Sequence, residues 1–315
     1  MKRVLITGIS GFAGSHLAES LVRKKKYEIY GTVFGDGYQP VGVPKHQLVK
    51  LNLIDREATL TLIKKIQPEW IFHLAALSSP AKSFFDPRET LTNNIEAQVN
   101  ILDGALGDKK IERLLVIGSA EEYGQVTEND LPIDEKVNLN PVSPYAVSKI
   151  AQDFLGRQYF LSHQLPVIRV RPFNHTGERQ APLFVVPAFA KQIAEIEKSK
   201  TEATMKVGNL KSYRDFSDVK DMVEAYRLAM EQGKLGEVYN LGSGQAYQIE
   251  RVLTELLLMS RVKIKVVTDP KRWQPSDVPK LVADSGKFKR LTGWQTTIPF
   301  SETLTRVLDY WRKQI

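Results

Sequence analysis

Three glycines near the N-terminus constrain the fold of this chain more than any other feature. Gly8, Gly11 and Gly14 follow a short apolar run, residues 4–6, and precede apolar residues at helical spacing. This order predicts a strand, a tight turn and a helix. Glycine allows the sharp turn and a close backbone approach to a ligand, and the free N–H groups at the helix start favour a phosphate. We therefore predict a dinucleotide-binding turn, with a tight turn that binds no ligand as the alternative.

Strand and helix patterns then alternate along the chain. We expect strands at residues 27–34, 47–51, 70–74, 113–117 and 167–170, and helices at 56–66, 88–105 and 143–163. Such alternation predicts right-handed crossovers and a parallel sheet. The predicted fold is α/β: a Rossmann-type doubly wound parallel sheet over residues 1–171, then a smaller C-terminal α/β substrate-binding lobe over most of 172–315. Some segments of the second part are expected to return to the sheet.

Composition excludes several classes of protein. The 315 residues are 42% hydrophobic, with no apolar run long enough to cross a bilayer and no signal-peptide pattern, so we expect a cytoplasmic protein without a membrane partner. Cysteine is absent and the five histidines are scattered, so we expect no metal site. The net charge is +8 and the pI is about 9.4. No nucleic-acid motif accompanies this charge, which favours a diphosphate-bearing substrate over nucleic acid.

A second motif, Tyr145-Ala-Val-Ser-Lys149, places a phenol and an ammonium four residues apart. On a helix both side chains share one face. An ammonium close to a phenol lowers the pKa of the phenol, which makes it a usable proton donor or acceptor near neutral pH. The spacing alone is common by chance. Its position after the fifth predicted strand of a dinucleotide fold gives it weight.

Together with the glycine turn, these residues resemble the extended short-chain dehydrogenase/reductase family, from residue 1 to about 312. The resemblance implies that Tyr145 and Lys149 stand beside the nicotinamide, and that Lys149 also holds its ribose. It implies that Ser119, just after the fifth strand, bonds the reacting oxygen; a Ser119 that only caps a turn stays open. The cofactor contacts implied are Gly8, Gly11, Phe12, Ala13, Gly14, Asn52, Leu53, Leu74, Ala75, Ala76, Asn94, Tyr145 and Lys149.

The choice of cofactor is less constrained. An acidic residue at the end of the second strand would bind the 2′-hydroxyl of NAD, and an arginine would favour the 2′-phosphate of NADP. The chain has Phe34-Gly35-Asp36-Gly37 there, with neither clearly placed, and Asn52 does not decide the question. By resemblance we expect NADP, with NAD possible.

Five further segments resemble GDP-4-keto-6-deoxy-D-mannose reductases, and next GDP-mannose 4,6-dehydratases; they lie at residues 119–124, 171–175, 206–209, 214–219 and 275–279. The substrate contacts implied are Asn174, Lys191, Arg214, Arg272 and Asp277. The planar guanidinium of Arg214 suits a diphosphate, although a structural ion pair with Asp215 or Asp218 stays open. Gln274 stands where relatives usually carry arginine.

The residues after Ser119 bear on the reaction. A 4,6-dehydratase needs acid and base groups beyond Tyr145, and the dTDP-glucose type resembling this fold uses Asp followed by Glu where this chain has Ala120-Glu121. A GDP-mannose dehydratase keeps only the Glu, so Glu121 remains a candidate catalytic residue.

We expect NAD(P)H-dependent reduction of a nucleotide-linked 4-keto-6-deoxyhexose, with GDP-D-rhamnose as the product. The alternative within the fold is a dehydratase or 4-epimerase with tightly bound cofactor. A non-catalytic dinucleotide sensor and a nucleic-acid binder are the alternatives outside it. The resemblance also implies a homodimer formed through helices 88–105 and 143–163.

Overall fold

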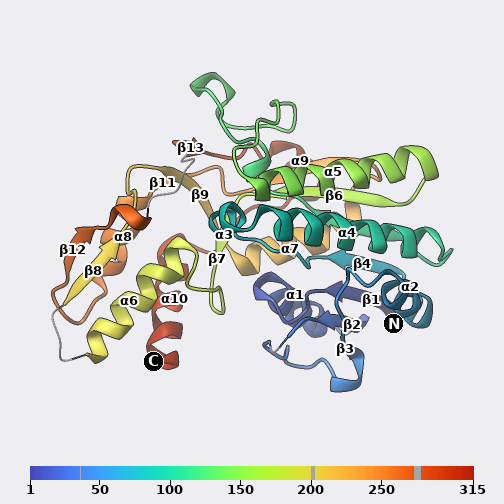
Figure 1. The fold of residues 1–315 in the computed structure, drawn as a ribbon, viewed down its shortest axis with the longest axis horizontal. Helices are drawn as coiled ribbons and strands as arrows, with labels where there is room; N and C mark the ends of the chain where they lie inside the picture. Colours follow the sequence, from blue (N-terminus) through green and yellow to red (C-terminus); the bar gives the residue numbers. More distant parts are fainter. Residues whose placement is uncertain (36, 200–202, 273–277) are drawn as a thin grey trace.

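A seven-stranded parallel sheet dominates the computed structural model, which describes residues 1–35, 37–199, 203–272 and 278–315. Its strand order is β10-β6-β5-β4-β1-β2-β3 (Figure 1). The strands are β1 (Lys2–Thr7), β2 (Tyr27–Val33), β3 (Leu48–Lys50), β4 (Trp70–His73), β5 (Arg113–Ile117), β6 (Val167–Pro172) and β10 (Val238–Leu241). This sheet confirms the predicted α/β fold class. The order reverses between β1 and β4, and ligands of such sheets bind beyond the carboxyl ends of the strands at that point.

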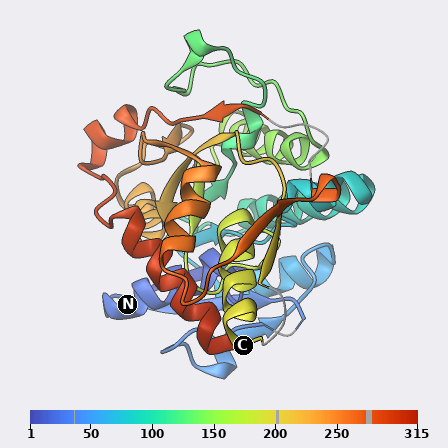
Figure 2. The same ribbon diagram turned by 90° about the vertical axis from the view of Figure 1, so that its left-hand side faces the viewer.

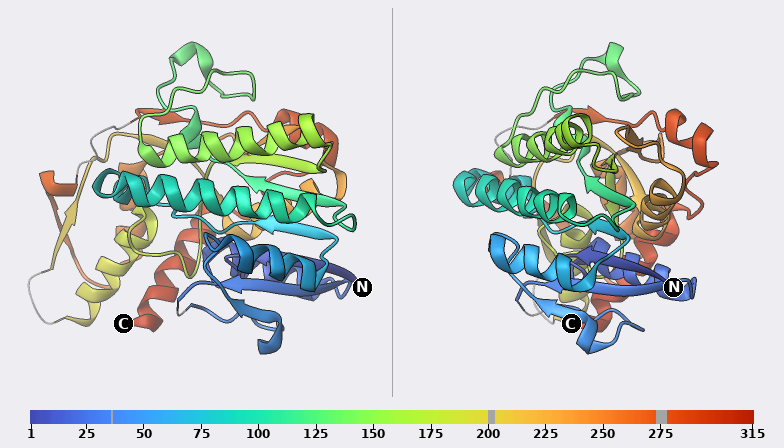
Figure 3. Two further views of the ribbon diagram at one scale, coloured as in Figure 1. Left: turned by 45° about the vertical axis from the view of Figure 1, so that its right-hand side comes forward. Right: turned by 90° about the vertical axis from the view of Figure 1, so that its right-hand side faces the viewer.

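Helices cover both faces of the sheet. One face carries α1 (Phe12–Arg23), α7 (Val219–Gln232) and α9 (Gly286–Thr292), packed on a buried core that includes Leu17 and Tyr226. The other carries α2 (Arg56–Ile66), α4 (Pro87–Leu106) and α5 (Pro144–His163), which lie side by side in Figure 3. Both β10 and α7 follow residue 172, so the later part of the chain contributes to this layer.

A smaller lobe lies at one end of the sheet, at the left in Figure 1, and faces the viewer in Figure 2. It contains α6 (Val185–Lys198), α8 (Ile249–Leu258) and α10 (Phe300–Gln314), together with the parallel pair β8 (Thr204–Val207) and β12 (Lys265–Thr268). These elements share a third buried core. No helix in the described part of the chain is long and apolar enough to cross a bilayer.

A short sheet connects the two parts. Its strands are β7 (Asn174–Thr176), β9 (Tyr213–Asp218), β11 (Ala246–Gln248) and β13 (Lys280–Leu281), with β9 pairing with the other three. The short helix α3 (Pro80–Phe85) was not expected from the sequence, because six residues are too few to show a helical period. Four 3₁₀ turns complete the described elements: η1 (Lys45–Gln47), η2 (Ala120–Glu122), η3 (Glu128–Asp130) and η4 (Pro270–Arg272).

Local capping signals fix where the site helices begin. Ser143 caps α5, its Oγ accepting from the Ala146 N–H at 3.1 Å, and Pro144 occupies the first turn. Asp218 caps α7 in the same way through the Lys220 N–H. Such caps satisfy N–H groups that the first turn leaves free. The cap of α5 places Tyr145 and Lys149 at the carboxyl edge of the sheet.

Candidate active site

The glycine turn forms one wall of a cavity of about 300 Å³ at the switch point of the sheet. Gly8 has a φ of 66°, and a Cβ there would lie 3.0 Å from Cα of Ala75. A Cβ on Gly14 would lie 2.2 Å from the carbonyl oxygen of Gly8. Only glycine fits these two positions. The turn therefore brings bare backbone to the cavity wall.

The N-terminus of α1 is open toward this cavity. Gly11, Phe12, Ala13 and Gly14 line the cavity, and among the described residues no side chain caps the helix. Free N–H groups and the positive end of the helix dipole favour an anion here. A dinucleotide pyrophosphate fits this cradle.

Ser119, Tyr145 and Lys149 line the same cavity, although the first comes from the end of β5 and the others from α5. All three are buried. The backbone N–H of Tyr145 donates to Oγ of Ser83 at 3.1 Å, which ties α5 to α3. The structure thus brings together three residues that the sequence separates by up to thirty positions.

The pKa of Tyr145 differs from the sequence-based expectation. Burial raises this pKa above its ordinary value, and hydrogen bonding to Ser119 opposes the rise only in part. The Lys149 ammonium was expected to lower it, and burial raises it instead. Desolvation of the phenolate therefore outweighs the cation, and the phenol stays protonated. Burial also lowers the pKa of Lys149 to about 8.

Ser119 has two roles in the geometry. Its Oγ accepts from the Glu121 N–H at 3.2 Å, so it does cap the turn η2. Its own N–H donates to Oε1 of Glu122 at 2.7 Å. The cap fixes the direction of a hydroxyl that also lines the cavity, so capping and a role in the site are compatible.

A buried ionic layer supports this part of the site. Glu122 pairs with Nε of Arg171 at 2.9 Å, and Asp153 accepts from Arg171 at 2.8 Å and from Arg169 at 2.6 Å. All four side chains are almost fully buried. Sequence reasoning missed this layer. The available signal was the pair of arginines two residues apart in the otherwise apolar strand β6.

A second cavity of about 410 Å³ adjoins the first, and the two share Pro80, Glu121, Asn174 and Phe184 as lining residues. Arg214 and Arg272, both expected from the sequence, line the second cavity. Lys206 also lines it and was missed as a single residue.

Asp215 and Asp218, the alternative ion-pair partners considered for Arg214, bind other groups in the structure. The guanidinium of Arg214 donates to the carbonyl oxygens of Tyr213 and Val278 at 2.8 and 2.7 Å. Asp215 accepts from the backbone of Ser243, Gly244 and Ala283, and Asp218 pairs with Arg306. The Arg214 side chain is thus oriented by backbone oxygens at the wall of the second cavity.

Several expected site residues lie elsewhere. Asn52 and Leu53 do not line either cavity; Leu53 is buried, and its carbonyl accepts from Asn100 at 2.8 Å. Lys191 pairs with Glu195 at 2.6 Å on α6, also away from both cavities. Asp277 and Gln274 fall outside the described residues.

The remaining expected cofactor contacts surround the first cavity. Leu74 and Ala76 line it. Asn94 is fully buried and supports the wall, because its side chain accepts from the N–H of Leu77 at 2.8 Å and donates to Oγ of Ser148 at 2.9 Å. His175, Gln180 and Tyr226 also line the cavity but were not singled out from the sequence.

The chain matches the family model described as GDP-mannose 4,6 dehydratase over residues 5–307. It belongs to this family. The expected resemblance is therefore confirmed. A GDP-6-deoxy-D-mannose reductase from Pseudomonas aeruginosa is 30% identical over the whole of this chain and 98% of its own length.

Solved structures agree with this assignment. The structure of RMD from Pseudomonas aeruginosa complexed with NADPH has a TM-score of 0.88 and 29% identity, with both chains covered completely. The UDP-glucose 4-epimerase from Thermus thermophilus complexed with NAD has a TM-score of 0.87 and 27% identity, covering 99% of this chain and all of its own.

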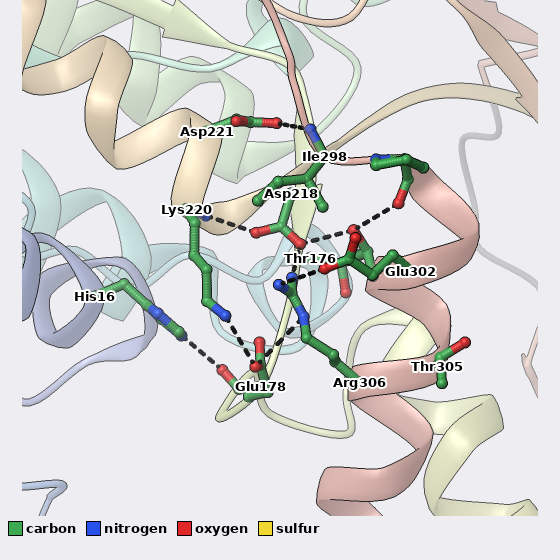
Figure 4. Close-up of polar contacts among 12 residues, drawn as sticks. His16, Thr176, Glu178, Asp218, Lys220, Asp221, Ile298, Glu302, Thr305 and Arg306 are labelled. Atoms are coloured by element: carbon green, nitrogen blue, oxygen red, sulfur yellow. Dashed lines mark hydrogen bonds and ion pairs between the residues drawn. The ribbon is translucent and has the colours of Figure 1, made fainter.

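In this member of the GDP-mannose 4,6-dehydratase family, the loop around Glu178, which follows β7, is held by contacts with three helices (Figure 4). The Glu178 carboxylate forms ion pairs with Lys220 of α7 at 3.3 Å and with Arg306 of α10 at 3.5 Å. Nε2 of His16 on α1 lies 3.0 Å from the backbone oxygen of Glu178. This arrangement links the C-terminal helix of the smaller lobe to the cofactor-side helix. It holds in place a segment that carries Asn174 to the cavities.

His16 gives this family member an expected dependence of stability on pH. Burial lowers the pKa of His16 to about 4, below the ordinary value of 6.5. Between these values the unfolded chain takes up a proton that the folded chain does not, so stability is lost as pH falls. His16→Gln removes the titration. We expect the wild type to lose about 1 kcal/mol per pH unit more than the variant between pH 6 and pH 4.5.

Urea unfolding at several pH values measures this difference. The exposed His46 provides the matched control, because His46→Gln removes a histidine that folding leaves exposed. Parallel stability curves for wild type and His16→Gln would show that His16 does not titrate in this way.

Proposed function

We propose that this protein reduces the C4 keto group of GDP-4-keto-6-deoxy-D-mannose with NADPH, forming GDP-6-deoxy-D-mannose, which is GDP-D-rhamnose. The observation that carries the proposal is the pair of adjoining cavities, with Ser119, Tyr145 and Lys149 in the first and Arg214 in the second. Similarity to a GDP-6-deoxy-D-mannose reductase and to an RMD complexed with NADPH supports it.

The first cavity fits a nicotinamide dinucleotide. The backbone cradle at Gly8 and Gly14 and the open start of α1 would hold the pyrophosphate. Tyr145 and Lys149 would lie at its nicotinamide end. When bound, the reduced cofactor supplies the hydride for C4. We expect NADPH to be preferred and NADH to be accepted as the weaker alternative.

The chain supplies the proton and the alignment. Tyr145, whose pKa burial raises, is protonated at neutral pH and donates its proton to the oxygen at C4 as the carbonyl is reduced. Ser119 donates a hydrogen bond to the same oxygen and fixes its direction. Lys149 stabilises the phenolate that remains on Tyr145. Solvent must then return a proton to the phenolate before the next turnover.

The second cavity would hold the nucleotide diphosphate. Arg214, Arg272 and Lys206 give its wall a positive charge. Asn174 and Glu121 lie where the two cavities join, and we propose that they contact the hydroxyl groups of the sugar. On this basis residues 1–171, with β10 and α7, form the cofactor domain, and the smaller lobe binds the nucleotide sugar.

One observation favours a second function. Glu121 lines both cavities beside Tyr145, and it is the carboxylate that a GDP-mannose 4,6-dehydratase would use for elimination at C5 and C6. A dehydratase or 4-epimerase would return the hydride and show no net use of cofactor.

The two functions are distinguished by stoichiometry. The purified protein is incubated with NADPH, or with NADH, and freshly prepared GDP-4-keto-6-deoxy-D-mannose, and the absorbance of reduced cofactor is followed while the sugar product is identified. We expect one NADPH oxidised per GDP-6-deoxy-D-mannose formed. Conversion of GDP-mannose to a 4-keto sugar without added cofactor would instead assign the dehydratase function and a catalytic role to Glu121.

We also propose a cytoplasmic homodimer. Val147, Phe154 and Leu161 recur every seven residues on α5, and their side chains are 45%, 47% and 60% exposed, which forms an apolar stripe on the outer face of this helix. Packing of two such faces would bury it. A cytoplasmic location follows from the supply of NADPH and nucleotide sugars. Light scattering should give twice the mass of the chain, and Phe154→Glu should reduce it to one chain; a wild-type protein with the mass of one chain would contradict the dimer.

A further inference from the structure

An amide group holds the Lys149 ammonium inside the protein. Nζ of Lys149 donates to Oε1 of Gln152, three residues further along α5, at 2.7 Å. Both side chains are buried, at 4% and 1% exposure. An ammonium has three N–H donors, so this bond leaves two for groups in the cavity. Gln152 does not line either cavity and has no part in the proposed chemistry itself.

The amide of Gln152 is fixed in one orientation from α4. Its Nε2 donates to the backbone oxygen of Asn94 at 3.0 Å and to Oε1 of Gln98 at 3.4 Å. A backbone carbonyl can only accept, so the NH₂ group must face Asn94. The amide oxygen is then the atom that faces Lys149. Two helices together therefore set the position of the lysine.

Lys149 is surrounded by charged and titratable groups, whereas the amide oxygen of Gln152 that accepts from it is neutral. Glu122 of η2 and Asp153 of α5 lie within electrostatic reach of it, and burial raises the pKa of Glu122 to about 8. His73 of β4 is buried beside it, with a pKa that burial lowers to about 3. Tyr145 completes the set on the cavity side. A carboxylate in place of the amide would form an ion pair with the ammonium and cancel its field at the phenol. An amide oxygen binds the ammonium and leaves its charge in place.

We propose that Gln152 is a positioning residue: its amide oxygen holds Lys149 at the cavity as a cation that forms no direct ion pair among the described residues, ready to stabilise the Tyr145 phenolate. This inference rests on the proposed function, because it assigns the residue that supports the proton donor of that reaction.

Two substitutions of Gln152 separate position from charge. Gln152→Leu removes the acceptor, and Gln152→Glu replaces it with a nearly isosteric carboxylate. A leucine side chain and an ionised glutamate both lack an N–H, so neither can donate to the backbone oxygen of Asn94 as Gln152 does. Both variants therefore lose that contact and differ mainly in the charge beside Lys149. We expect the pKa of Lys149 to fall by about one unit in Gln152→Leu and to rise by about one unit in Gln152→Glu.

Nitrogen-15 NMR of lysine-labelled protein measures this pKa without cofactor or substrate, and the Lys149→Met variant assigns the signal. In turnover, the alkaline limb of the kcat profile should move to lower pH in Gln152→Leu and to higher pH in Gln152→Glu, with kcat reduced about tenfold and KM almost unchanged. The control is the exposed Gln232 at the end of α7, where the same two substitutions should move neither quantity.

Shifts in opposite directions support the proposal. An unchanged Lys149 pKa in both variants, or a shift in the same direction, overturns it. If Gln152→Leu does not fold, the comparison of the Lys149 pKa between the near-isosteric Gln152→Glu and the wild type decides the question by itself. If the protein reduces no 4-keto sugar, the proposed function fails, and the NMR titration still decides whether Gln152 positions Lys149.

Discussion

Tyr145→Phe is expected to lower kcat for the 4-keto sugar by about 10²- to 10⁴-fold, the range that a positioned general acid contributes. The substitution removes one oxygen from a side chain that is 8% exposed and leaves its ring packing in place. The reduced oxygen at C4 then has no protonated phenol to accept from. Affinity for NADPH should change little, because the backbone at Gly8 and Gly14 forms the proposed pyrophosphate cradle.

Stopped-flow absorbance of NADPH measures the loss of hydride transfer, and fluorescence titration measures NADPH binding. Tyr310→Phe on α10, outside both cavities, is the matched control and should keep the wild-type kcat. A Tyr145→Phe protein with nearly full kcat would show that another group supplies the proton.

Asp153→Asn should reduce the free energy of unfolding by about 3–5 kcal/mol. Asp153 is 1% exposed and accepts from both Arg169 and Arg171, so a neutral amide leaves two buried guanidinium groups with less negative charge. Glu122 remains as a partner of Arg171 but does not pair with Arg169. The loss therefore falls mainly on Arg169.

Urea unfolding of wild type and variant at pH 7 measures the effect. The control is Asp309→Asn, which removes the carboxylate of an ion pair with Arg312 whose Asp309 side chain is 50% exposed. Exposed pairs contribute at most about 1 kcal/mol. Equal small losses in the two variants would mean that the buried layer stabilises the fold no more than a surface pair.

The parts of the fold that the sequence predicted well are those encoded by neighbouring residues. The helix predicted at 56–66 is α2 with the same bounds, and the strand predicted at 113–117 is β5. A helical or strand period is visible within each segment. The turn at Gly8 and Gly14 is also local in part: the positive φ of Gly8 and the contact of Gly14 with the Gly8 carbonyl lie within one turn, whereas the contact of Gly8 with Ala75 joins distant segments. Tyr145 and Lys149 share a face for the same reason.

The parts that were missed depend on contacts between distant segments. Lys191 was expected at the substrate; its ammonium pairs with Glu195 on its own helix, and its contact with the substrate stays a prediction, since the packing of α6 decides which of its faces meets the cavity. The pKa of Tyr145 was expected to fall, and burial raises it instead. Gln152 carried no sequence signal at all, because its significance depends on the backbone of Asn94 on another helix.

The sequence by itself determined the alternation of strands and helices, the glycine turn, and the spacing of Tyr145 and Lys149, because each is a property of residues close together in the chain. The resemblance already implied that Ser119 joins them, and part of the second half was expected to return to the sheet. The tertiary structure alone decided that Asn174 and Glu121 stand where two cavities meet, and that β10 is the strand that returns. Burial and charge at these places depend on every segment that packs there. The burial and the local charge of a site residue are therefore set only when the distant segments have packed around it.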